Sequence, residues 1–84
     1  MLKDERKGGT MGDLKAILLL NGYTVTTLAA GAIQAVKGTE DWYAIREAFG
    51  ITLYDKNGKE KFTNNPADAA REILFYGKRA AMVA

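Results

Sequence analysis

The chain divides into short amphipathic segments, and the first three repeat their apolar residues every three or four positions. That spacing matches one face of an α-helix and predicts helices over about 13–20, 24–37 and 39–49. Asn21-Gly22 ends the first helix, because glycine tolerates the left-handed conformation that follows many helix C-termini.

The second and third predicted helices each bury one stripe of apolar residues. The stripes comprise Val25, Leu28, Ala29, Ala32, Ile33 and Val36, and then Trp42, Ile45 and Phe49. Gly31 lies within the second helix, where glycine costs about 1 kcal/mol relative to alanine. It either permits close packing or marks a break in the helix, and the residues leave both interpretations open.

After residue 50 the apolar period shortens from about 3.6 to about 2, which is typical of β-strands. Asn57-Gly58, between the alternating segments 51–54 and 60–63, is a strong hairpin signal. Asn65-Pro66 then opens a final helix, with asparagine as the N-cap and proline at the first helical position. The predicted fold class is therefore α+β: a small, mainly helical domain with three helices, a β-hairpin and a C-terminal helix.

The N-terminal residues differ from the rest of the chain. Residues 1–10 are charged and contain glycine without an apolar period, so we expect a flexible leader. Met11 is an alternative natural start. Thr10 and Asp13 have the spacing of a capping box at the start of the first helix. A single compact α+β domain is therefore expected over 11–84.

The composition fits one small globular domain. Hydrophobic residues make up 48% of the 84 residues, too many for a disordered chain. The chain has no cysteine and no histidine, which excludes disulfides and a structural zinc site. Homodimerisation is the remaining device that commonly stabilises so small a domain. The lack of cysteine fits a reducing cytoplasm, and no apolar run approaches the ~18 residues of a membrane span.

The sequence predicts no enzyme, no cofactor and no metal site. Without histidine, acid–base catalysis near neutral pH is left to carboxylates, lysines and tyrosines. The closest acidic set, Glu40, Asp41 and Glu47, is explained by helix capping and a solvated face. A calcium loop starting at Asp55 is also excluded, because Gly58 stands too early in it for the required turn.

The stretch from Leu14 to Ala29 combines a short amphipathic helix, a glycine-bearing turn and a second helix that starts at Thr24. It resembles the opening of the helix-turn-helix DNA-binding domains of phage repressors. The segment from Asp41 to Ile51 resembles a later core helix of the same family, so the resemblance covers at most Leu14 to Ile51, in broken pieces. It implies a DNA-binding regulator that lays a helix in the major groove of double-stranded DNA.

Lysines surround the predicted hairpin turn, as in the wing of winged-helix DNA binders, where they contact phosphates. The same lysines would also protect an exposed edge strand from aggregation. The net charge of +2 permits nucleic acid as a partner without demanding it. The expected DNA-contacting residues are Thr24, Thr26, Thr27, Gln34, Lys37, Lys56, Lys59 and Lys61.

The alternative function is a protein–protein interaction module, such as a small inhibitor or adaptor, that uses an exposed aromatic patch. Aromatic residues are numerous for so small a core, and exposed Tyr and Trp are common interface anchors. The expected interface residues are Trp42, Tyr43, Tyr54 and Tyr76. Ordinary partial burial of these rings, with the tyrosine hydroxyls in water, is the other interpretation of the same residues.

Overall fold

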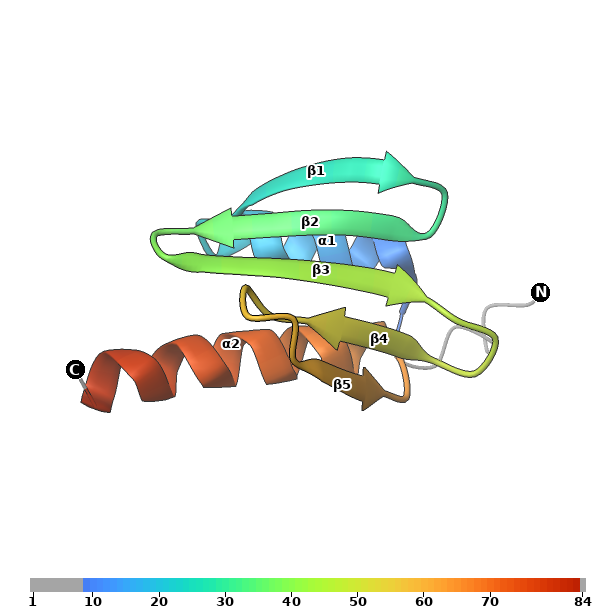
Figure 1. Ribbon diagram of the computed structural model, residues 1–84. Coiled ribbons are helices and arrows are strands. Elements are labelled where there is room, and N and C mark those ends of the chain that lie inside the picture. Colours follow the sequence, from blue (N-terminus) through green and yellow to red (C-terminus); the bar gives the residue numbers. More distant parts are fainter. Residues whose placement is uncertain (1–8, 84) are drawn as a thin grey trace.

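A five-stranded sheet and two helices form the fold (Figure 1). The computed structural model describes the backbone of residues 9–83 and the side-chain environments of residues 9–76. The elements in chain order are α1 (Met11–Leu20), β1 (Thr24–Ala29), β2 (Ala32–Lys37), β3 (Glu40–Arg46), β4 (Ile51–Tyr54), β5 (Glu60–Thr63) and α2 (Pro66–Val83). Each strand pairs antiparallel with the next, so the order across the sheet is β1-β2-β3-β4-β5.

Local side-chain signals fix the starts of both helices. The Thr10 hydroxyl accepts a hydrogen bond from the Asp13 backbone N–H, and the Asp13 carboxylate accepts one from the Thr10 N–H. At α2, the Asn65 side-chain oxygen accepts from the Asp68 N–H at 2.8 Å, and Pro66 is the first helical residue. The predicted caps of both helices are therefore confirmed.

The predicted hairpin is also confirmed, as β4 and β5. The Asp55 carboxylate accepts hydrogen bonds from the backbone N–H groups of Asn57 and Lys59, each at 2.9 Å. Gly58 has a φ of +82°, a backbone conformation that residues with a Cβ atom rarely adopt. The turn is therefore stabilised by its own residues, which is why it could be recognised from sequence.

Residues 24–46 form three strands, and the prediction of a mainly helical domain with three helices before the hairpin is wrong. Four consecutive β-branched residues, Thr24 to Thr27, open the first of these strands, and such residues favour extended backbone. Gly31 has a φ of +78° and lies in the turn between β1 and β2, so it interrupts the segment. The segment 24–37, which was expected to form the second helix of a helix-turn-helix, is instead a β-hairpin.

The apolar residues of the two wrongly predicted helices alternate between the faces of the sheet. In β3, Trp42 and Ala44 are buried, whereas Tyr43 and Ile45 are exposed. The proposed stripe of Trp42, Ile45 and Phe49 therefore does not exist. Phe49 lies in the β3–β4 loop and is 87% exposed.

The hydrophobic core lies between the helices and one face of the sheet. Ile33, Ala44 and Leu53 are neighbours across three strands, and all three are buried. The remaining core residues are Leu14, Leu18, Tyr23, Ala35, Trp42, Ile51, Ala69, Ala70 and Ile73. The buried residues of α1 and α2 cluster with strand residues of this one face only. Both helices therefore cover the same face of the sheet (Figure 1). Neither α1 nor α2 is both long enough and apolar enough to cross a membrane.

Candidate functional site

The face of the sheet opposite the helices carries two long cross-strand rows of side chains, and we call it the open face. The strand registers define these rows. The apolar row consists of Ala29, Ala32, Ile45, Thr52 and Phe62. The tyrosine row consists of Thr26, Gln34, Tyr43, Tyr54 and Glu60. A shorter third row comprises Thr24, Val36 and Asp41.

Two tyrosines lie side by side in the middle of the open face. Tyr43 of β3 is directly opposite Tyr54 of β4. The side-chain amide of Gln34 donates to the Tyr43 hydroxyl at 3.2 Å and to the Asp41 carboxylate at 2.9 Å. These two bonds link the Gln34, Tyr43 and Asp41 side chains on the open face.

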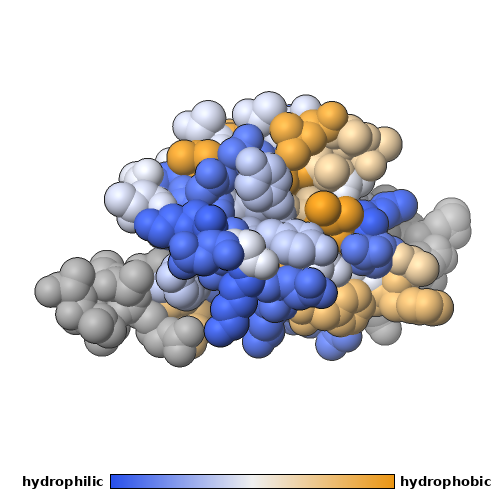
Figure 2. All heavy atoms as spheres, in the orientation of Figure 1, coloured by the Kyte–Doolittle hydropathy of each residue, from blue (hydrophilic) through white to orange (hydrophobic). Residues whose placement is uncertain are grey.

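The apolar row gives the open face an exposed hydrophobic end. Phe62 is 50% exposed and Ile45 is 36% exposed, and Thr52 between them is buried. Figure 2 shows hydrophobic residues gathered toward the end of the molecule where the β1–β2 and β3–β4 turns lie in Figure 1, while hydrophilic residues cover much of the centre. Exposed apolar residues that gather on one surface mark interaction sites more often than isolated apolar residues do.

The charged residues within the strand rows of the open face are acidic. Asp41 and Glu60 belong to its rows. The basic residues within the five strands are Lys37, Arg46 and Lys61, and all three occupy positions of the helix-facing set. Lys37 donates to the Asn21 carbonyl at 2.9 Å, and Lys61 lies 3.8 Å from the Glu72 carboxylate of α2.

The predicted DNA-contacting residues do not share one surface. Three of them, Thr24, Thr26 and Gln34, lie on the open face. Three others, Thr27, Lys37 and Lys61, lie on the helix-facing side, and the last two, Lys56 and Lys59, lie in the β4–β5 turn. Gln34 is already bonded to Asp41 and Tyr43, and the Thr27 hydroxyl accepts from the Lys15 ammonium at 3.2 Å.

The predicted aromatic interface is divided between the two faces. Trp42 and Tyr76 pack edge to face on the helix side, with ring centroids 5.3 Å apart. Tyr43 and Tyr54 lie on the open face. Sequence reasoning missed Ile45 as a member of the same surface, although alternation along β3 places it on the face of Tyr43.

A hydrogen-bonded cluster closes the end of the helix-facing side near the β2–β3 turn. The Glu40 carboxylate accepts from the Tyr23 hydroxyl at 2.6 Å and from the Trp42 indole N–H at 3.0 Å. The Lys37 ammonium lies 5.3 Å from the centre of the Tyr23 ring. Burial, together with the Glu40 carboxylate, raises the pKa of Tyr23 above its ordinary value of 10.0. The Tyr23 hydroxyl, the Trp42 indole N–H and the Glu40 carboxylate therefore all have hydrogen-bond partners within the cluster.

Neither a metal centre nor a known relative assigns chemistry to this site. Within the part of the chain that the structure describes, no three His, Cys, Asp or Glu side chains gather as metal ligands would. The open face, with its two tyrosines and its apolar row, is the candidate functional site. Comparison with known proteins found no matching family model, no similar curated protein and no similar solved structure.

Proposed function

We propose that this protein is a protein-interaction module that binds its partner across the open face of the sheet. The observation that carries the proposal is the separation of side chains between the two faces. Tyr43, Tyr54, Ile45 and Phe62 project from the face without helices, while the basic strand residues occupy the other side. Tyrosine and large apolar side chains are the groups that anchor protein–protein interfaces.

The charge of the open face favours protein over nucleic acid. A DNA-binding surface gains most of its affinity from lysine and arginine at phosphates. Asp41 and Glu60 would instead face those phosphates and repel them. The lysines of the β4–β5 turn, Lys56 and Lys59, lie outside the tyrosine and apolar rows, although Lys56 lines a small pocket together with Asp41.

The same charges specify the partner's chemistry. A partner surface with apolar groups opposite Ile45 and Phe62, and with arginine or lysine opposite Asp41 and Glu60, would be complementary. An arginine between the two tyrosine rings would also gain cation–π energy of about 0.5–2 kcal/mol. We therefore propose a basic protein surface as the partner.

The proposal includes a non-enzymatic role and a cytoplasmic location. The support for both is compositional: the chain contains no histidine and no cysteine. These absences leave few tunable acid–base groups and fit a reducing compartment.

The experiment compares partner capture by the parent protein and by an Ile45→Glu variant. Proteins retained from an extract of the source cells are identified, purified and titrated against each variant by calorimetry. Because a carboxylate in the apolar row would be buried without a counter-ion, we expect affinity for the true partner to fall at least about tenfold. Tyr43→Ala should weaken the same complex.

Ala16→Glu is the matched control, because it adds the same charge at an exposed position of α1. It should bind like the parent protein. Equal affinity of Ile45→Glu and Ala16→Glu for every captured protein would refute the proposal. So would retention of labelled duplex DNA at low salt that weakens steeply as salt is added, because that behaviour indicates phosphate binding.

A further inference from the structure

A groove runs between the last strand and the last helix. It has a volume of about 450 Å³ and is open along its length. The strand side of the groove is a run of four consecutive residues, 61–64, and the helix side is Asp68, Arg71, Glu72 and Phe75. Those helix positions are spaced i, i+3, i+4 and i+7, so they form one stripe along α2.

The strand side of the groove is the free edge of the sheet. β5 is the final strand in the order β1-β2-β3-β4-β5, so one of its edges faces no other strand within residues 9–83. A wall of four successive residues is what such an edge presents, because side chains alternate between the faces while the backbone faces outward. Unpaired backbone N–H and C=O groups at an edge are a template for one more strand.

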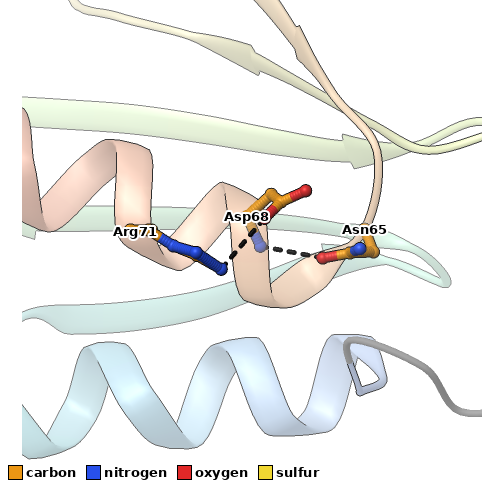
Figure 3. Close-up of polar contacts among 3 residues, drawn as sticks. All are labelled: Asn65, Asp68 and Arg71. Carbon is orange, nitrogen blue, oxygen red and sulfur yellow. Dashed lines mark hydrogen bonds and ion pairs between the residues drawn. The ribbon is translucent and has the colours of Figure 1, made fainter.

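The charged side chains of the groove form two ion pairs, and in each pair the cation is the more exposed member. Arg71 pairs with Asp68 at 3.0 Å (Figure 3), and Lys61 pairs more loosely with Glu72 at 3.8 Å. The basic side chains are 67% and 59% exposed, whereas their acidic partners are 36% and 32% exposed. A ligand that enters the groove therefore finds the cations more accessible than the carboxylates.

We propose that the groove binds an extended acidic peptide of a partner protein, which adds to β5 as a sixth strand beside α2. Main-chain hydrogen bonds to the β5 edge would supply affinity, and alternate side chains of the peptide would reach the helix wall. Acidic residues of the peptide pair with Arg71 and Lys61. The groove shares Phe62 with the apolar row, but its strand edge and its helix stripe lie outside the open face, so it does not depend on the function proposed above.

The test uses three synthetic peptides and amide NMR of the isotopically labelled protein. The probe is acetyl-TVEVEVT-amide, which is extended and acidic. A basic version, acetyl-TVKVKVT-amide, tests the charge preference, and acetyl-TVEPEVT-amide tests strand addition, because proline removes a backbone donor from the ladder. We expect the acidic probe to shift the amide signals of 61–64 and of the helix stripe, with a dissociation constant of about 1 mM or below.

Charge reversal at the groove supplies the matched comparison. In the Arg71→Glu variant the preference for the acidic over the basic probe should fall by about tenfold or more. Lys15→Glu makes the same charge change on α1, beside the opposite edge of the sheet, and should leave both affinities unchanged. Circular dichroism of both variants checks that the fold is intact.

Three results would overturn the proposal. The first is the absence of shifts at residues 61–64 with the acidic probe at several millimolar. The second is equal binding of the proline-containing peptide, which would mean that no strand is added. The third is concentration-dependent shifts at the β5 edge without any peptide, which would identify a second copy of this chain as the occupant.

Discussion

At the scale of single residues, the Tyr23 hydroxyl donates a short hydrogen bond of 2.6 Å to the Glu40 carboxylate, in a cluster that also contains Trp42. One carboxylate oxygen of Glu40 accepts from both aromatic side chains. Hydrogen bonds to a charged acceptor contribute more to stability than neutral ones, roughly 1.5–3 kcal/mol each. This cluster joins the chain just after α1 to the start of β3, so it ties the two ends of the β1–β2 hairpin together.

The raised pKa of Tyr23 gives the cluster a characteristic pH dependence. Below the ordinary tyrosine pKa of 10.0 the hydroxyl is protonated in the folded and the unfolded chain, so its contribution to stability is complete. Above pH 10 the unfolded chain releases the proton first, and the folded state loses stability with a limiting slope of about 1.4 kcal/mol per pH unit. The Tyr23→Phe variant lacks this loss. Urea unfolding of both proteins at pH 8, 10 and 11 should show the parent's advantage shrinking as pH rises. A constant difference across that range would contradict the account of the cluster.

Short-range signals were the part of the sequence that predicted structure well. Asn65 bonds the Asp68 N–H, and Asp55 bonds N–H groups within its own turn, so these motifs act over four residues or fewer. No such local rule predicts the joint action of Tyr23 and Glu40, which are 17 residues apart in sequence. The same holds for the pairing of Tyr43 with Tyr54, because the register of two strands creates it.

At the scale of elements, the segment 24–46 shows why apolar periodicity alone misled. In β2, Ile33 and Val36 are spaced like residues on one helix face, while Ile33 and Ala35 are spaced like residues on one strand face. Both patterns fit six residues that are rich in alanine. Cross-strand hydrogen bonding decides the outcome, since β2 is paired on both sides by β1 and β3. The β-branched run in β1 was the sequence signal that could have predicted it.

Replacing Gly31 by alanine should change the stability of the protein in opposite directions for the helix predicted from sequence and for the observed β1–β2 turn. In a helix, Gly→Ala would stabilise the protein by about 1 kcal/mol. In the β1–β2 turn it should destabilise the protein by about 1–2 kcal/mol, because φ is +78° and the new Cβ would lie 3.3 Å from the Arg46 Cβ. Gly12→Ala, within α1, is the control and should be neutral or stabilising by about 0.5 kcal/mol. Urea denaturation measures both, and a gain in stability for Gly31→Ala would contradict the hairpin.

At the scale of the whole molecule, the fold has one layer of helices and one layer of sheet. The helices bury one face of the sheet, so the fold itself leaves the other face available (Figure 1). A core needs only the helix-facing residues, such as Leu53 and Ile33, to be apolar. The large apolar side chains of Ile45 and Phe62 on the open face therefore contribute little to the core. We propose that they are apolar because they bind a partner protein.

The central claim is that the open face is the surface on which a protein partner binds. The most direct measurement is the amide NMR spectrum of the labelled protein during titration with the partner obtained by capture. The account predicts that shifts concentrate on the tyrosine and apolar rows, around Tyr43, Ile45, Tyr54 and Phe62. Shifts confined to α1, α2 or the β4–β5 turn, with those rows unchanged, would contradict it.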